Sequence, residues 1–174
     1  MTETNLDPKQ TFTKLAQIGF VVRDIEKYAG FLTEVFGIGP FRVIDYPPAN
    51  REDVIRYYHG KPADFTARLA FANVGEMELE LIQPVSGENI WFDFLEEHGE
   101  GIHHIRFNVT DIDQTTAYLE ERDVPVLQMG SGLRPGTFFK YFDTEDKAGF
   151  IIEALNQLPG TDGKAPAFKE GQVE

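Results

Sequence analysis

Cysteine is absent from the 174 residues, which excludes disulfides, thiolate metal sites and a cysteine nucleophile. Long hydrophobic runs are absent too, since no stretch approaches the ~20 apolar residues of a membrane helix. The first ten residues, MTETNLDPKQ, have neither the basic start nor the apolar run of a signal peptide. We therefore expect a cytoplasmic protein without membrane association, in which any metal is held by histidine, carboxylate or amide ligands.

Positive charge is scarce: 16 Lys and Arg stand against 29 Asp and Glu, for a net charge of -13. Such an excess repels nucleic acid and anionic membranes, so neither is expected as a partner. A small anionic substrate remains compatible, because the field in a cleft depends on nearby groups and on any bound cation. The hydrophobic content of 41% is sufficient for one compact core.

Both ends of the chain lack a periodic hydrophobic pattern. Residues 1–12 are polar, and residues 157–174 mix proline, glycine and charge. These stretches are predicted to be a disordered N-terminus and a flexible C-terminal tail. The fold is therefore expected between residues 13 and 156.

Within this span the sequence repeats weakly. Residues 17–26, QIGFVVRDIE, match residues 104–113, HIRFNVTDID, at an offset of 104 − 17 = 87 positions. Each segment is typical of a strand followed by a helix, in which Asp24 or Asp111 caps the first turn by accepting bonds from its free amides. The repeat predicts two similar modules.

Each module is predicted to be a strand, a helix and three further strands, over residues 13–84 and 102–156, with residues 85–101 as a connector. The later strands are expected at 41–46, 65–73 and 77–83, and at 125–129, 138–142 and 150–155. The last strands also align, because Glu80 corresponds to Glu153 at an offset of 73 (153 − 80). An insertion within residues 46–64 accounts for the difference between the two offsets.

Alternation along a strand separates apolar from polar faces. Four strands each show one apolar face and one face with a polar group: Gln17, Glu80, His104 and Glu153. Each of these groups alone is compatible with a solvated sheet face, and a lone histidine with a structural role. Their equivalent positions in the repeat instead favour one shared site.

The motifs around these residues resemble those of a known family. Residues 101–105, GIHHI, lie between 80–84, ELIQP, and 151–153, IIE. This arrangement is similar to the glyoxalase, or vicinal-oxygen-chelate, superfamily, with glyoxalase I and methylmalonyl-CoA epimerase as the nearest examples. The resemblance covers residues 13–156. It implies an α+β fold in which two βαβββ modules form a cup-shaped mixed β-sheet half-barrel with helices outside.

The resemblance also implies a divalent-metal site. One ligand comes from the first and one from the last strand of each module, which gives Gln17, Glu80, His104 and Glu153. The epimerases usually carry histidine where this chain has Gln17, but glutamine occurs there in one class of glyoxalase I. The mixed nitrogen and oxygen set suits Zn²⁺, Co²⁺, Ni²⁺ or Mn²⁺. We assign proton transfer to Glu153 and Glu80, on either side of the substrate.

Three functions fit this site. The first is an isomerase or epimerase that moves a proton next to a thioester or ketone carbonyl, acting on an acyl-CoA or another small carbonyl compound. The second is a lactoylglutathione lyase of the glyoxalase I type, although Val21 and Pro84 stand where that class carries arginine and asparagine. The third is a non-catalytic small-molecule binding protein. An extradiol dioxygenase is disfavoured because its iron needs two histidines. A homodimer is expected, since paired-module relatives often dimerise.

Other polar residues near the predicted site receive weaker assignments. His103 is expected on the face opposite His104, so the two should not share one ion. Glu78 shares the face of Glu80. Arg106 faces the predicted cup and is a candidate for binding a substrate carboxylate, unless it pairs with Glu78. Arg134 lies in a glycine-rich segment that is either a hairpin turn or a lid meeting an anion.

Overall fold

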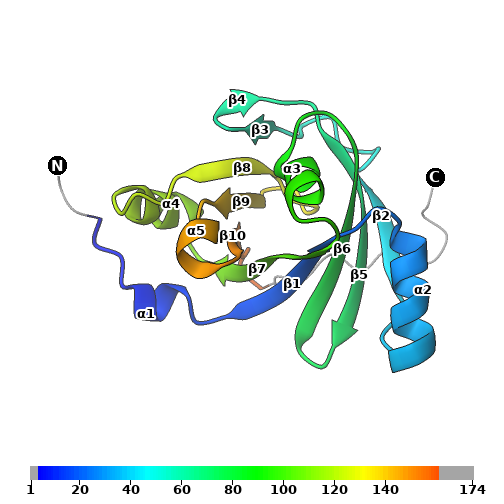
Figure 1. Ribbon diagram of the computed structural model, residues 1–174. Coiled ribbons are helices and arrows are strands. Elements are labelled where there is room, and N and C mark those ends of the chain that lie inside the picture. Colours follow the sequence, from blue (N-terminus) through cyan, green and yellow to red (C-terminus); the bar gives the residue numbers. More distant parts are fainter. Residues whose placement is uncertain (1–3, 161–174) are drawn as a thin grey trace.

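The computed structural model describes residues 4–160, which form one ten-stranded mixed sheet in the order β2-β5-β6-β1-β7-β10-β9-β8-β3-β4 (Figure 1). The first module contains β1 (Leu15–Val21), α2 (Ile25–Phe36), β2 (Arg42–Tyr46), β5 (Thr66–Val74) and β6 (Met77–Ser86). The second contains β7 (Gly101–Val109), α4 (Ile112–Glu120), β8 (Val126–Ser131), β9 (Phe138–Phe142) and β10 (Ile151–Asn156). The remaining elements are α1 (Pro8–Thr11), β3 (Arg56–Tyr58), β4 (Lys61–Pro62), α3 (Ile90–Glu97) and α5 (Glu145–Ala148).

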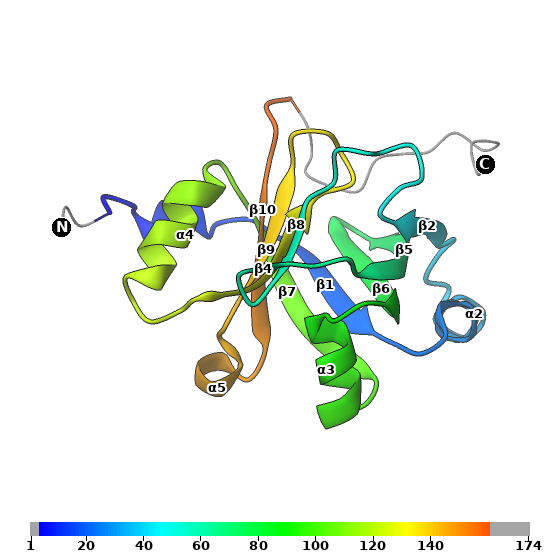
Figure 2. The same cartoon turned by 90° about the horizontal axis from the view of Figure 1, so that it is seen from above.

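The two modules are joined at their first strands. Strand β1 pairs in parallel with β6, β7 pairs in parallel with β10, and β1 and β7 pair with each other antiparallel. Seen from above in Figure 2, β2, β5, β6 and α2 of the first module lie to the right of β1, and α4 of the second module lies to the left. The α+β half-barrel of paired βαβββ modules is therefore confirmed.

The predicted capping residues begin both long helices. Asp24 accepts a 2.9 Å bond from the amide of Lys27, and Asp111 accepts a 2.8 Å bond from the amide of Gln114. Gly37 ends α2 in the left-handed region, with φ of 68°. None of the helices among residues 4–160 is both long and apolar enough to cross a membrane.

The apolar core consists of separate clusters on the two faces of the sheet. On the outer face, one cluster with Val22, Ile25 and Leu81 packs under α2, and another with Ile112 and Ala154 packs under α4. A third and larger cluster lies on the concave face, hereafter the cup. Helix α3 packs against β1 and β6 and buries Trp91 and Leu95 in this third cluster. The alternation of the strands thus leaves the second face for the cup and its polar residues.

The expected insertion within residues 46–64 forms the hairpin β3–β4. It does not extend its own module: β3 pairs with β8 and so lengthens the sheet of the second module. This pairing uses backbone groups that the edge strand β8 would otherwise expose. Sequence offsets located the insertion but carried no information on its partner strand.

Part of each predicted unstructured end is ordered. Within residues 1–12, α1 forms a helical turn capped by Asp7, and the ring of Phe12 packs edge-on against Phe107. Within residues 157–174, the amide of Gln157 donates to the carbonyl of Val109. The expectations for residues 1–3 and 161–174 concern positions outside the described residues. Helix α5 was not expected from the sequence.

Candidate metal centre

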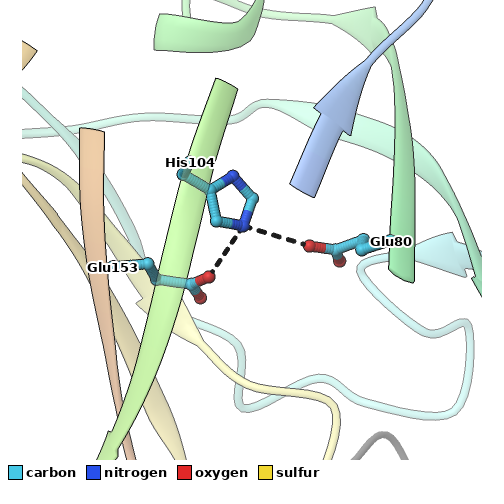
Figure 3. Close-up of side chains that lie close together, drawn as sticks. All are labelled: Glu80, His104 and Glu153. Carbon is cyan, nitrogen blue, oxygen red and sulfur yellow. Dashed lines mark ion pairs between the residues drawn. The ribbon is translucent and has the colours of Figure 1, made fainter. Parts of the chain in front are cut away.

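Three of the four predicted ligands form a compact buried group. One ligand atom each from Glu80, His104 and Glu153 lies within 4.8 Å of the others. The Nε2 atom of His104 is 3.0 Å from Oε2 of Glu153 and 3.5 Å from Oε2 of Glu80, and Figure 3 shows the ring between the two carboxylates. The acids come from β10 and β6, one from each module. The modules therefore bring together residues that are distant in sequence.

The fourth predicted ligand, Gln17 of β1, completes the group. Its Oε1 atom lies 3.4 Å from Nε2 of His104, and the residue is fully buried. Its Nε2 atom donates a 2.9 Å hydrogen bond to Oε1 of Glu78. A carboxylate only accepts such bonds, so Glu78 holds the amide with its oxygen toward His104.

Gly19 makes room for the imidazole. It lies opposite His104 in the antiparallel pairing of β1 with β7. A Cβ atom placed on Gly19 would collide with the ring of His104. A residue with a side chain at this position would displace the imidazole, which explains why β1 has glycine at the one point where the ring crosses it.

The buried charges at this end of the cup do not cancel. Glu78, Glu80 and Glu153 are buried together, and Glu78 pairs with two guanidinium groups, that of buried Arg106 at 3.4 Å and that of partly exposed Arg42 at 3.9 Å. With His104 neutral, three carboxylates and two guanidinium groups leave one negative charge. Buried carboxylates without full compensation are unfavourable, and a bound divalent cation would stabilise them.

The pKa values show how this protein responds to that imbalance. Burial raises the pKa of Glu80 above its usual value of 4.5. Burial opposes protonation of His104, but the neighbouring carboxylates of Glu153 and Glu80 outweigh it and raise the pKa of this imidazole from 6.5 to about 9. In the metal-free protein, bound protons thus offset part of the excess negative charge at the centre.

The donor set fits a divalent metal ion. Three oxygen atoms face one nitrogen, Nε2 of His104, at 3.0 to 3.5 Å, and a single N–H cannot donate to all three. Among the described residues, Oε2 of Glu153 is buried without a hydrogen-bond partner, because its contact with Nε2 has ion-pair distance but not hydrogen-bond geometry. One imidazole, two carboxylates and one amide oxygen suit the first-row divalent metals and zinc.

The expectation that His103 lies on the opposite face from His104 is wrong. The pairing of β1 with β7 shifts register, so that Gly19 is opposite His104 while Phe20 is opposite Ile102. His103 is the extra residue of this β-bulge, where simple alternation does not hold. Its Nδ1 atom lies 3.0 Å from Nδ1 of His104, and the residue is 1% exposed.

A cavity of about 660 Å³, including its open mouth, adjoins the candidate ligands. Glu80, Glu153 and Arg106 line its polar part, and Arg134 reaches its wall from the β8–β9 loop. Most of the remaining lining is apolar or aromatic, including Tyr46, Leu69, Phe71, Trp91, Phe139 and Tyr141. Such a cavity suits a small molecule that has an apolar body and a polar end near the ligands.

Two residues at the site escaped the sequence reasoning. Glu78 shares the face of Glu80 and pairs with Arg106, an alternative the sequence offered, but its hydrogen bond to Gln17 was not foreseen. Tyr141 packs its ring edge-on against both His103 and His104, at centroid distances of 5.6 and 5.0 Å. Burial raises the pKa of its phenol far above the usual value. A tyrosine within the aromatic strand β9 gave no signal that separated it from a core residue.

Comparison with known proteins agrees with this architecture. An uncharacterized protein of Synechocystis sp., slr0090, is 34% identical over 82 residues, which are 44% of this chain and 24% of that protein. This chain thus matches about a quarter of the length of that relative.

Solved structures share the fold at low sequence identity. Methylmalonyl-CoA epimerase from Mycobacterium tuberculosis superposes with a TM-score of 0.63 and 18% identity, over 90% of this chain and 95% of that one. The Streptomyces coelicolor methylmalonyl-CoA epimerase in complex with 2-nitronate-propionyl-CoA gives a TM-score of 0.62 and 22% identity, over 84% and 99%. At these identities the likeness concerns the fold alone.

The family model described as the glyoxalase/bleomycin resistance protein/dioxygenase superfamily matches residues 16–141, more than half of the chain. The matched range contains β6, β7 and all of β1 except its first residue, and therefore Gln17, Glu80 and His104, while Glu153 lies beyond it. Together with the paired βαβββ modules, this match shows that the chain belongs to the glyoxalase/bleomycin resistance protein/dioxygenase superfamily.

Proposed function

We propose that this protein is a metal-dependent isomerase or epimerase that moves a proton at the carbon next to a thioester or ketone carbonyl. The observation that carries the proposal is the placement of two buried carboxylates, Glu80 and Glu153, on either side of His104 and at the wall of one cavity. Methylmalonyl-CoA epimerases among the structures with the same fold support the choice of chemistry.

Gln17, Glu80, His104 and Glu153 would hold the divalent metal, which supplies Lewis acidity toward the substrate carbonyl and so acidifies the adjacent C–H bond. Zinc, cobalt, nickel and manganese all accept such ligands. The carboxylates then act on the α-carbon. An oxygen of Glu153 takes the proton from one face, the electron pair of the C–H bond enters the carbonyl system, and the acid form of Glu80 returns a proton to the other face.

This assignment needs Glu80 and Glu153 in opposite protonation states at the start of each turnover. In the metal-free protein, burial raises the pKa of Glu80 above its usual value. In the reverse direction the two residues exchange roles. Inversion at carbon follows from the two acids facing the substrate from different modules.

The residues that line the cavity favour a particular kind of substrate. Its aromatic wall favours an apolar acyl portion, and Arg134 offers positive charge to a carboxylate or phosphate, whereas Arg106 pairs with Glu78. An acyl-CoA would place its acyl end inside and its nucleotide outside. Other small carbonyl compounds with an anionic group fit the same features.

Two alternatives make different predictions. A lactoylglutathione lyase would turn over a glutathione hemithioacetal, but Val21 is fully buried in the core and Pro84 is also buried, so neither replaces the polar glutathione contacts of that class. A non-catalytic binding protein would hold metal and ligand without turnover. We also propose that the protein acts in the cytoplasm as a homodimer.

Solvent-exchange NMR tests the proposal. Metal-loaded protein in D₂O should incorporate deuterium at the α-carbon of a 2-methyl-branched acyl-CoA and interconvert its epimers. In Glu80→Gln and Glu153→Gln variants, interconversion should be lost while one epimer still exchanges with solvent, because one acid remains. The exposed Glu76→Gln variant serves as a control. Hemithioacetal turnover would support the lyase instead, and metal binding without either reaction would support the binding protein.

A further inference from the structure

Neither module symmetry nor strand alternation provides a role for His103, which lies beside the candidate metal centre. It is the extra residue of the β-bulge in β7 and is 1% exposed. β-bulges are often found next to active sites, where they redirect a side chain. Here the bulge turns the His103 ring toward His104 instead of away from it.

The contact between the two rings restricts their protons. The Nδ1 atoms of His103 and His104 are 3.0 Å apart, so one must donate and the other accept. Nε2 of His104 faces the oxygens of Gln17, Glu80 and Glu153. When its lone pair is used for a cation, the remaining proton of His104 is on Nδ1. His103 must then accept at Nδ1 and carry its own proton on Nε2.

The surroundings of His103 are largely aromatic, and its Nε2 atom is buried without a hydrogen-bond partner among the described residues. Its ring lies edge-on to Phe94 at 5.1 Å and to Tyr141 at 5.6 Å, and Tyr141 also packs against the His104 ring. Metal-binding histidines usually donate their second N–H to a carboxylate, a backbone carbonyl or a water molecule. A carboxylate here would add negative charge beside three buried acids, whereas an imidazole accepts the bond without doing so.

We propose that His103 is a positioning residue for the metal ligand His104. Its Nδ1 atom accepts the hydrogen bond from Nδ1 of His104, which fixes the tautomer and the ring orientation that direct Nε2 into the site. This inference rests on the metal centre of the proposed function. It extends the site to a residue that does not touch metal or substrate.

Two substitutions separate acceptance of a hydrogen bond from filling of space. In His103→Asn, the side-chain oxygen can occupy nearly the place of Nδ1 and still accept. In His103→Leu, the aromatic surroundings are filled but no acceptor remains. Loss of a hydrogen-bonding partner behind a ligand typically weakens metal binding by about 10- to 100-fold. We expect such a loss of zinc affinity in the leucine variant and a much smaller one in the asparagine variant.

The corresponding changes at His98 serve as matched controls. The side chain of His98 is 41% exposed, lies 3.3 Å from Glu145 and packs against Phe94, the ring that also contacts His103. His98→Asn and His98→Leu should leave zinc affinity unchanged. Thermal unfolding of all four variants establishes that each is folded before its affinity is compared.

The hydrogen bond itself is measured by NMR with ¹⁵N-labelled histidine. We expect nitrogen–nitrogen coupling between Nδ1 of His104 and Nδ1 of His103, in the zinc-loaded and the metal-free protein alike. Absence of this coupling in both states, or equal zinc affinity in His103→Leu and the wild type, would overturn the inference. If the wild type binds no zinc, the proposed function fails, and the coupling still decides whether His103 orients His104.

Discussion

The carboxylate of Glu78 accepts a 2.9 Å hydrogen bond from the side-chain nitrogen of Gln17, which leaves the amide oxygen of Gln17 facing His104 at 3.4 Å. Glutamine is a weak metal ligand with two chemically different ends. A fully buried acid behind it selects the oxygen end. The weakest ligand of the candidate centre is thus oriented by a residue that is not itself one of the four.

Replacement of Glu78 tests this relationship. Glu78→Gln keeps an oxygen that can accept from Gln17, whereas Glu78→Met removes it at similar volume. We expect zinc affinity to fall about tenfold in the methionine variant and little in the glutamine variant, in line with other supporting contacts behind metal ligands. Competition with a chromophoric chelator measures both. Equal affinities would show that the hydrogen bond has no part in orienting Gln17.

Gly19 and Gly30 form a second pair of test positions. A Cβ at Gly19 would collide with the His104 ring, so Gly19→Ala should destabilise the fold by about 1–3 kcal/mol and lower metal uptake. Gly30, inside α2, has open space around it, and Gly30→Ala should stabilise the helix by about 0.5–1 kcal/mol. Urea unfolding and metal analysis report both effects. An alanine at position 19 that preserves metal uptake would refute the steric account.

Metal binding should release a proton at neutral pH. The pKa of His104 is raised to about 9 in the metal-free protein, and a metal requires the neutral imidazole. Calorimetric titration with zinc in buffers of different ionisation enthalpy should give about one proton released per ion at pH 7.5, declining above pH 9. Binding enthalpies that do not depend on the buffer would contradict the raised pKa.

The same shift affects the stability of the metal-free protein. Because the folded-state pKa of His104 lies above its ordinary value of 6.5, the imidazolium stabilises the fold fully below pH 6.5. This contribution is lost as the pH rises through 9. Denaturant midpoints of the chelator-treated protein should therefore fall across this range, and His104→Gln should reduce the fall. If the midpoint falls equally steeply with pH in the wild type and in His104→Gln, the effect belongs to other groups.

Arg134 should contribute to substrate binding but not to the metal site. It lines the cavity from the β8–β9 loop. Arg134→Gln should raise KM for an anionic substrate several-fold while metal content and kcat stay the same. Arg122→Gln is a suitable control, because Arg122 stacks on Tyr118 away from the cavity. An unchanged KM would remove Arg134 from the binding site.

The fold and the grouping of Gln17, Glu80, His104 and Glu153 in one place were accessible from the sequence because both follow the repeat. The offsets that relate Gln17 to His104 and Glu80 to Glu153 predicted the modules, and alternation predicted which side chains share the cup. The same alternation failed at His103, since a bulge depends on how two strands pair and not on the residues of one. Likewise, the hairpin β3–β4 pairs with strand β8 of the second module, and the sequence of the first module alone does not indicate that partner.

Titration of chelator-stripped protein with Zn²⁺ or Co²⁺ tests the central claim most directly. The account predicts one tightly bound ion per chain in the wild type and a loss of that binding in His104→Phe, with both proteins folded. A wild-type protein that takes up no divalent ion, or a His104→Phe variant that binds it equally well, would contradict a metal centre formed by Gln17, Glu80, His104 and Glu153.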